Sequence, residues 1–208
     1  MRSVLVTGFE PFADKATNPS ELAVRQLAGR TIRKHHVEIA ILPVVFDDAI
    51  TALRSAIRRH EPALVICVGE AGGRTGISVE RIAINIDDAR IADNAGAQPI
   101  DRTIARRGPA AYWSTLPIKA ITAALRRADI PAEVSQTAGT FVCNHVFYGL
   151  MHALHGTKIR GGFIHVPFAR GQGKPSLPLA TIVHALDIAI ATAIRVKRDR
   201  RLRGGAEH

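Results

Sequence analysis

The sequence predicts a three-layer α/β/α domain with a mostly parallel, twisted β-sheet and helices on both faces. Short apolar runs rich in β-branched residues alternate with segments whose apolar residues recur at helical spacing, and several of the apolar runs end in glycine loops. The 208 residues, 47% of them hydrophobic and 22% charged, suffice for one full core. We find no internal repeat or linker, and therefore expect a single domain at residues 1–194 and a basic, frayed tail at 195–208.

The first half of the chain is expected to supply three strands and two helices. A glycine loop, Gly8–Phe12, follows the first apolar run, as in α/β proteins that place ligand groups at the carboxyl ends of strands. Asn18-Pro19 marks the start of the first helix, because proline suits the first helical position. The expected strands occupy residues 3–7, 37–42 and 63–68, and the second helix occupies residues 47–59.

The middle of the chain has a different pattern. Apolar and polar residues alternate over 74–86 with one slip near Arg81, which predicts a pair of short strands or a bent excursion with one solvated face. Residues 87–109 are polar and rich in Asp, Arg, Gly and Pro. This stretch is long for a structureless loop, so we expect it to be functional or to contain small elements.

The second half returns to alternating strands and helices. Strands are expected at 132–135 and 160–166, and helices at 116–127, from about Cys143 onward, and at 177–195. Strands that alternate with helices imply parallel β-α-β crossovers and hence helices on both faces of the sheet.

Cys143 is the first candidate for chemistry. Val146, Leu150 and Leu154 recur after it at helical spacing, which places Cys143 at or just before the first turn of a helix. The unpaired N–H groups and positive dipole end of a helix start favour a thiolate and could hold an oxyanion. The alternative is a buried structural cysteine.

His165 is the candidate base. It lies close to the carboxyl end of the strand at 160–166, so it could share one edge of the sheet with Cys143. A Cys–His pair within hydrogen-bond reach is the minimal machinery of a thiol hydrolase. The alternative is a histidine satisfied within the core. A third group would have to fix the tautomer of the imidazole, and spacing alone leaves four candidates: Glu80, Asp87, Asp88 and Asp93.

Three further histidines share the helix with Cys143 and could be interpreted as metal ligands: His145, His152 and His155. No acidic or cysteine partner stands at a ligand-like interval from them. We therefore predict no metal and no other cofactor, and interpret these histidines as part of a partly exposed helix face.

Seven segments of the chain match a known pattern in order and at similar spacing. They are Thr7–Phe12, Ala71–Arg74, Glu80–Asn85, Asp87–Asn94, Ser114–Pro117, Gly139–His145 and Phe163–Pro167. In these segments the chain resembles the pyroglutamyl-peptidase I family of cysteine peptidases, also called pyrrolidone-carboxylate peptidases. The resemblance extends to about Ala193 and excludes the basic tail.

The resemblance implies a Cys–His–Glu triad with Cys143 as nucleophile, His165 as general base and acid, and Glu80 as the orienting carboxylate. It also implies that an N-terminal pyroglutamyl residue is removed from peptides through a thioester, which water then hydrolyses. Arg90, beside the triad in the family pattern, could support the oxyanion or the Cys143 thiolate.

The resemblance further implies an aromatic pocket for the flat, neutral lactam ring, formed by Phe9, Phe12 and Phe141, with Asn18 as a polar contact. Plain core packing is the alternative for these phenylalanines. Glu70 departs from the family pattern, which usually has Gln or an apolar residue there. This carboxylate could accept the lactam N–H, or could raise the pKa of Cys143 and leave a weakened paralogue or a thiol amidase with another substrate.

Net charge and composition limit the classes of partner that the protein can have. The formal net charge is +10, and about half of this excess lies in residues 195–203, where six Arg and Lys residues face a single Asp without interleaved aromatics. No nucleic-acid-binding motif accompanies this charge, so we expect no specific nucleic acid, although a non-enzymatic polyanion binder using the tail is the competing hypothesis. We expect no membrane contact and, from two cysteines without a disulfide framework, a cytoplasmic location. The resemblance suggests a homo-oligomer, often a tetramer.

Overall fold

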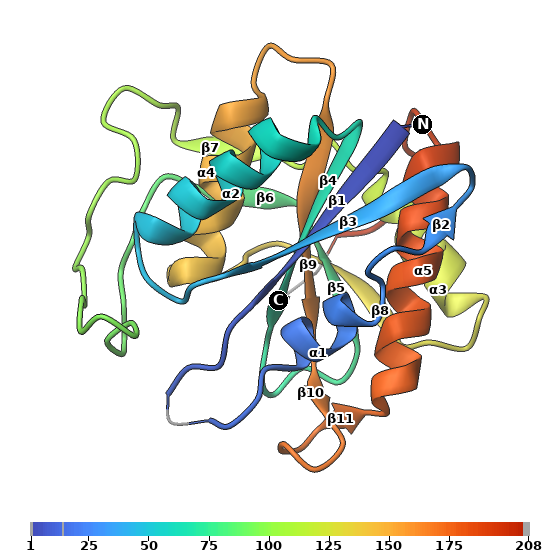
Figure 1. Cartoon of the computed structure of the whole chain (residues 1–208), viewed down its shortest axis with the longest axis horizontal. Coiled ribbons are helices and arrows are strands. Elements are labelled where there is room, and N and C mark those ends of the chain that lie inside the picture. The colour runs from blue at the N-terminus through green and yellow to red at the C-terminus, as the bar shows by residue number, and fades with distance from the viewer. Residues whose placement is uncertain (1, 14, 206–208) are drawn as a thin grey trace.

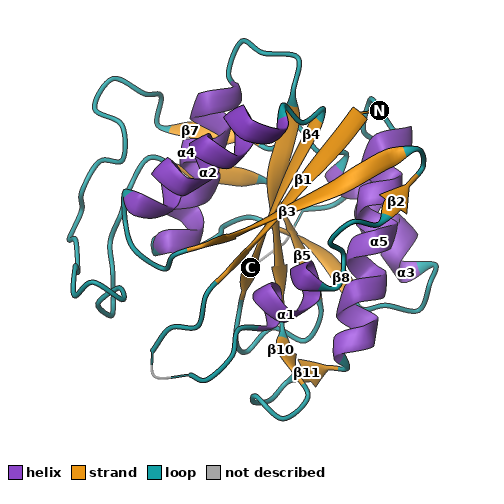
Figure 2. Cartoon of the chain, viewed as in Figure 1, coloured by secondary structure: helices purple, strands orange, loops and turns teal. Residues whose placement is uncertain are grey.

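The computed structural model describes residues 2–13 and 15–205, in which a twisted seven-stranded sheet lies between two layers of helices (Figure 1 and Figure 2). The strand order in the sheet is β2-β3-β1-β4-β9-β5-β8. These strands are β1 (Arg2–Phe9), β2 (Thr31–Ile32), β3 (His35–Leu42), β4 (Leu64–Glu70), β5 (Ile77–Glu80), β8 (Ala132–Ser135) and β9 (Arg160–Val166).

Most neighbouring strands are parallel, which confirms the predicted class. β1 pairs in parallel with β3 and β4, β4 with β9, and β5 with β8. Two pairs are antiparallel, β2 with β3 and β5 with β9. The chain reverses between β4 and β5 because the short connection at 71–76 leaves no room for a crossover helix.

The helices cover both faces of the sheet. On one face lie α1 (Pro19–Arg25), α3 (Ile118–Arg126) and α5 (Leu179–Arg195), and on the other lie α2 (Asp48–His60) and α4 (Val142–Leu154) (Figure 1). Side chains of β4 alternate between the two cores. Leu64, Ile66 and Val68 face the first layer, whereas Val65 and Cys67 face α2 and α4.

The excursion predicted after β4 is present as two short strands in different sheets. β5 belongs to the main sheet, whereas β6 (Ile82–Ile84) pairs antiparallel with β7 (Ala111–Trp113) beside α4. Arg81, where the alternation slips, separates β5 from β6. The long stretch at 87–109 contains one isolated bridge, between Asp87 and Arg102, and otherwise forms the loop that extends from the helical layer beside α4 (Figure 1).

Several boundaries differ from those predicted. α5 begins at Leu179 rather than at residue 177, because Ser176–Leu177 forms a strand, β11, that pairs with β10 (Phe168–Ala169). α3 begins at Ile118 rather than at residue 116, and the two-residue strand β2 was not predicted because it is too short to show a pattern.

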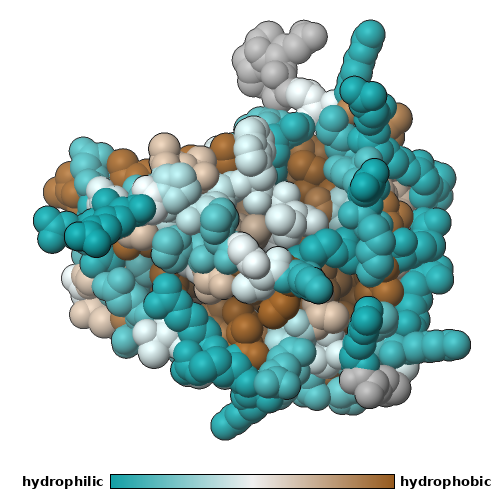
Figure 3. Space-filling model, turned by 90° about the horizontal axis from the view of Figure 1, so that it is seen from above, coloured by the Kyte–Doolittle hydropathy of each residue, from teal (hydrophilic) through white to brown (hydrophobic). Residues whose placement is uncertain are grey.

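The chain beyond α5 lies against α3. Asp199 accepts hydrogen bonds from the backbone N–H groups of Lys119 and Ala120 in the first turn of α3, at 3.0 and 2.9 Å. The frayed tail expected from residue 195 stays a prediction, and residues 206–208 lie outside the described part. On the face shown in Figure 3, hydrophilic side chains project around hydrophobic areas. Within the described residues, no helix combines the length and apolarity that crossing a membrane requires.

Candidate active site

Cys143 lies in the first turn of α4, directly after the N-cap residue Phe141 and Val142. This confirms the predicted position at a helix start. The next residue, Asn144, is buried and ties this turn to β6: its Oδ1 accepts from the N–H of Ile84 at 3.0 Å and its Nδ2 donates to the carbonyl of Ile84 at 2.9 Å. The cysteine therefore stands on a turn that is held from outside the helix.

His165 lies on β9 between two strands. Its Cα is paired with that of Gly69 on β4 and with that of Ser78 on β5. A Cβ atom built on Gly69 would lie 2.8 Å from Sγ of Cys143. The glycine therefore lets the cysteine approach the sheet beside the strand position of His165.

Glu80 is the carboxylate that the fold brings to His165. Its Oε1 lies 2.8 Å from Nδ1 of His165, and both side chains are buried, with 0% and 3% exposure. Because an ionised carboxylate can only accept, Nδ1 donates, and the neutral ring keeps its lone pair on Nε2. Nη1 of Arg74 donates to the same Oε1 at 2.7 Å.

The other three carboxylates considered from the sequence have different positions. Asp87 contacts His145, and Asp88 is exposed. Asp93 accepts from backbone N–H groups of its own loop and from that of Phe46. Spacing could not choose among the four because their separation depends on strand pairing over more than 70 residues of chain, such as the 85 residues between Glu80 and His165.

A cavity of about 440 Å³ opens above Cys143 and His165. The residues expected from the sequence to bind substrate all line it: Phe9, Phe12, Asn18, Glu70 and Phe141. Arg90, expected to give electrostatic support, lines it as well. The Phe12 and Phe141 ring centroids are 6.3 Å apart, and Phe46 packs edge-on against Phe141 at 5.5 Å. One side of the cavity is therefore aromatic.

Asn18 lines this cavity but uses its side chain to start a helix. Its Oδ1 accepts from the N–H and the hydroxyl of Ser20, at 2.9 and 2.8 Å, and its Nδ2 donates to the carbonyl of Glu10 at 3.0 Å. These bonds form the N-cap of α1. Asn18 thus fixes the loop that carries Phe9 and Phe12.

Glu70 presents a buried carboxylate to the cavity. Its Oε1 forms an ion pair with Nζ of Lys15, a residue that sequence reasoning missed. Nζ of Lys15 also lies 4.8 Å from the ring centroids of Phe12 and Phe168, so its ammonium group contacts the faces of both rings. The second oxygen, Oε2, is buried without a hydrogen-bond partner among the described residues.

Burial and nearby charged groups shift three pKa values in and beside this site. Burial, followed by the charges of Glu80 and Glu70, raises the pKa of Cys143 to about 12. Burial also raises the pKa of Cys67, on β4, to about 12. Burial acts to raise the pKa of Glu80, but the hydrogen bond and charge of His165 and the charge of Arg74 outweigh it, so the net pKa lies below the ordinary value of 4.5.

The pKa of Cys143 departs from the sequence-based expectation. The helix start was expected to favour the thiolate, yet burial and two nearby carboxylates favour the neutral thiol. Arg74 is the cation that counters this shift. Arg90 is exposed at the rim of the cavity. Arg74 could have been suspected from its place in the Ala71–Arg74 segment, but its contact with Glu80 needed the fold.

The described residues contain no group of three or more His, Cys, Asp and Glu side chains arranged to hold a metal ion. Nδ1 of His152 lies 2.8 Å from the hydroxyl of Tyr112, and His145 is bonded to Asp87. His155 packs beside Tyr112.

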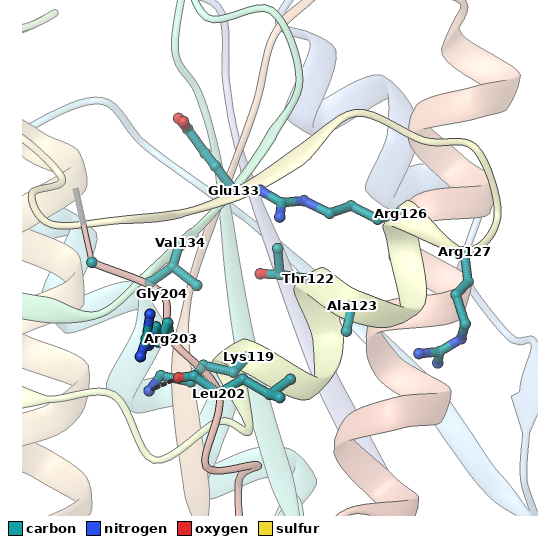
Figure 4. A pocket seen from close by; sticks show the side chains of 11 residues that line it. Lys119, Thr122, Ala123, Arg126, Arg127, Glu133, Val134, Leu202, Arg203 and Gly204 are labelled. Atoms are coloured by element: carbon teal, nitrogen blue, oxygen red, sulfur yellow. Dashed lines mark hydrogen bonds between the residues drawn. The ribbon is translucent and has the colours of Figure 1, made fainter. Parts of the chain in front are cut away.

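A larger cavity, of about 590 Å³, lies between α3, β8 and the chain beyond α5 (Figure 4). Lys119 donates to the carbonyl of Leu202, and Arg126 donates through Nε to the carbonyl of Ala132 at 2.7 Å. Lysine and arginine side chains therefore line this cavity, and no cysteine or histidine is among its lining residues.

Comparison with known proteins gives one consistent result. A family model described as pyroglutamyl peptidase matches residues 2–196. The chain is 56% identical to a pyrrolidone-carboxylate peptidase of Cupriavidus pinatubonensis and 55% identical to one of Klebsiella pneumoniae, with both chains covered completely in each case. The structure is similar to that of pyroglutamyl peptidase I from Bacillus amyloliquefaciens, with a TM-score of 0.94 and 47% identity over 98% of this chain and 100% of the other. It is also similar to pyrrolidone carboxyl peptidase from Thermococcus litoralis, with a TM-score of 0.93 and 36% identity over 98% and 100% of the two chains.

Proposed function

The chain belongs to the pyroglutamyl peptidase family, and from this premise we propose that it removes N-terminal pyroglutamate from peptides with Cys143, His165 and Glu80 as its triad. The observation that carries the assignment is the buried His165–Glu80 pair, which opens onto the same cavity as Cys143. This arrangement provides a nucleophile, a base with its lone pair on Nε2 and a carboxylate that orients the base.

The reaction proceeds in two halves. Nε2 of His165 takes the thiol proton as Sγ of Cys143 attacks the pyroglutamyl carbonyl carbon, and the imidazolium then protonates the leaving amine as the C–N bond breaks. In the second half, His165 takes a proton from water, whose oxygen attacks the thioester. Pyroglutamate leaves, and the proton returns to the thiol. Glu80 stabilises the imidazolium in both halves without becoming protonated.

Burial and the nearby carboxylates raise the pKa of Cys143, which favours a reaction in which proton transfer accompanies attack. A thiol with a pKa of about 12 is neutral at pH 7, so the resting enzyme does not store a thiolate. The unpaired N–H groups at the start of α4 can hold the oxyanion, with Arg90 at the rim as electrostatic support.

The aromatic side of the cavity suits the lactam ring. Phe9, Phe12 and Phe141 contribute apolar surface, and Oε2 of Glu70 is an acceptor with no partner among the described residues. We propose that the lactam N–H of the substrate donates a hydrogen bond to this oxygen. An ordinary charged N-terminus lacks this flat neutral ring, which explains the choice of a blocked substrate.

Hydrolysis of a pyroglutamyl-linked fluorogenic amide tests this function. We expect turnover by the reduced protein, a loss of at least about 1,000-fold in Cys143→Ala, and little change in Cys67→Ser. Iodoacetamide should abolish turnover as well. Loss of turnover in a folded Cys67→Ser protein would contradict the assignment of the nucleophile.

One observation favours a second candidate, a thiol amidase or weakened paralogue with another substrate. Glu70 raises the pKa of Cys143, so it could slow the pyroglutamyl reaction. Comparing wild type with Glu70→Gln on a series of pyroglutamyl and other amides separates the two. Activity that appears only in Glu70→Gln indicates the paralogue, and inactivity of both folded proteins on every pyroglutamyl amide indicates another substrate.

We also propose a cytoplasmic location and self-association, as the resemblance implies. Cys67 and Cys143 are both free thiols, as expected in a reducing compartment. Light scattering of the purified protein tests self-association, and fractionation of the source cells tests location.

A further inference from the structure

A second buried histidine lies two residues after Cys143 and takes no part in the proposed reaction. Nδ1 of His145 lies 2.9 Å from Oδ2 of Asp87, and both side chains are buried. The backbone N–H of Asp47 donates to Nε2 at 3.0 Å. Arg102 joins the two acids, with Nη2 2.9 Å from Oδ2 of Asp87 and Nη1 3.1 Å from Oδ2 of Asp47. We call these four residues the His145 network.

The network fixes one form of the imidazole. A backbone N–H can only donate, so Nε2 of His145 must carry its lone pair. The ring proton is therefore on Nδ1 and is donated to Asp87, whose negative charge is balanced by Arg102. The ring is thus neutral and held at both nitrogens.

Three chain segments meet at this ring. Asp47 is the N-cap residue of α2 and has a positive backbone φ of 64°. Asp87 and Arg102 exchange two backbone hydrogen bonds, of 2.7 and 2.8 Å, and so close the base of the long loop. His145 itself belongs to the first turn of α4. The network therefore joins α2, the loop at 87–102 and the turn that carries Cys143.

The same turn is coupled to the cavity wall. Phe46 lies edge-on against both His145 and Phe141, with ring centroids 5.3 and 5.5 Å apart. The backbone N–H of His145 also donates to the carbonyl of Phe141 at 3.1 Å. Because Cys143 lies between Phe141 and His145 in the same turn, a displacement of His145 moves the nucleophile and the aromatic wall together.

We propose that His145 is a positioning residue for the reaction, which sets the first turn of α4 and thereby the Sγ of Cys143 and the ring of Phe141. It touches no reacting atom. This proposal rests on the proposed function, in which Cys143 is the nucleophile. The reactivity of Cys143 can nevertheless be measured without a substrate. The competing role for a buried network of this kind is stability alone.

The test compares His145→Asn and His145→Ala with wild type and with His152→Asn. Asparagine keeps an N–H donor near the position of Nδ1, whereas alanine leaves Asp87 without this donor. His152 lies on the same helix, is exposed and bonds to Tyr112, so its variant is a matched control. For each protein we would measure the melting temperature, kcat and KM on the fluorogenic amide, and the rate of Cys143 alkylation by iodoacetamide.

The proposal predicts that folded His145→Ala loses about 10- to 100-fold in both kcat and alkylation rate, that His145→Asn recovers part of this loss, and that His152→Asn stays near wild type. A lower melting temperature with unchanged kcat and alkylation rate would overturn it and leave stability as the role. If wild type fails to cleave the amide, the proposed function fails, but the alkylation rates still decide this proposal.

Arg102→Gln is the second variant in case the buried changes prevent folding. Arg102 is exposed and completes the network from outside, where it also lies 5.5 Å from the ring centroid of Phe46, so its replacement removes no buried side chain. We expect the alkylation rate of Cys143 to fall in the same direction by a few-fold. An alkylation rate equal to that of wild type in folded Arg102→Gln would contradict the proposal.

Discussion

Two cavities of the described structure differ in what their charges do. The cavity above Cys143 has a volume of about 440 Å³ and brings together a thiol, an imidazole and buried carboxylates from β4, β5, β9 and α4. The cavity beside α3 is larger, about 590 Å³, and is lined by cations from α3 and the chain beyond α5. There the cations of Lys119 and Arg126 donate to backbone carbonyls.

This difference shows that the candidate active site is identified by the side chains that meet at a cavity and by their hydrogen-bond partners, and not by the volume of the cavity. At the smaller cavity Nδ1 of His165 donates to the Glu80 carboxylate, so Nε2 keeps its lone pair, and Cys143 lines the same cavity. At the larger one the polar contacts hold chain segments together, as Asp199 does at the start of α3. Changes at the first cavity should therefore alter activity, and changes at the second should alter stability.

Glu80→Gln should have the largest effect among the changes that keep the nucleophile. The amide can donate to Nδ1, which favours the wrong tautomer of His165, and it cannot stabilise the imidazolium. We expect kcat to fall by about 100- to 10,000-fold while the fold persists. Circular dichroism and steady-state kinetics check this, and a loss below ten-fold would remove Glu80 from the triad.

Gly69→Ala should have an intermediate effect. The added Cβ would lie 2.8 Å from Sγ of Cys143 and equally close to the ring of Phe163, so the thiol must shift. We expect kcat/KM to fall by about 10- to 100-fold with a smaller change in melting temperature. Gly29→Ala, at a position open to solvent, is a matched control for the added methyl group, apart from its positive φ of 71°. Wild-type kcat/KM in Gly69→Ala would show that Sγ does not need its observed position.

Glu70→Gln should have a smaller effect on the reactivity of Cys143. Since the pKa of Cys143 is raised to about 12, the alkylation rate of wild type should keep rising with pH between 7 and about 10 without reaching a plateau. Removing the charge of Glu70 lowers this pKa, so the rate at pH 7 should rise a few-fold. A plateau below pH 8 in wild type would show that the resting enzyme stores a thiolate after all.

Asp199→Ala should have no effect on activity. Its carboxylate accepts from two N–H groups in the first turn of α3, and losing such a cap costs about 1 kcal/mol of unfolding free energy. We expect a lower melting temperature and wild-type kcat. A fall in kcat comparable with that of Gly69→Ala would show that the two cavities are coupled and would break the comparison.

Short-range sequence patterns were sufficient to predict much of the fold. The helix start at Asn18-Pro19, the strand at 160–166 and the position of Cys143 at a helix start follow from capping and periodicity, which are short-range. The antiparallel placement of β5 and the strand order did not follow, because pairing between distant segments leaves no local pattern.

The same distinction applies to the candidate site. Residue types pointed to Cys143 and His165, whereas the choice of Glu80 among four carboxylates came from the family resemblance and its contact from the fold. Arg74 and Lys15 were missed because each acts through one long side chain that reaches an acid from another segment. The raised pKa of Cys143 was also beyond local reasoning, since burial exceeds the favourable effect of the helix start.

The most direct test of the central claim is to label the protein with a pyroglutamyl chloromethyl ketone and identify the modified residue by peptide mass spectrometry. This electrophile carries the lactam ring and alkylates the nucleophile that it reaches. The account predicts one label, on Cys143, that forms much faster than with an analogue lacking the lactam and that blocks hydrolysis completely. A label on Cys67 or another residue, or equal rates for both reagents, would contradict it.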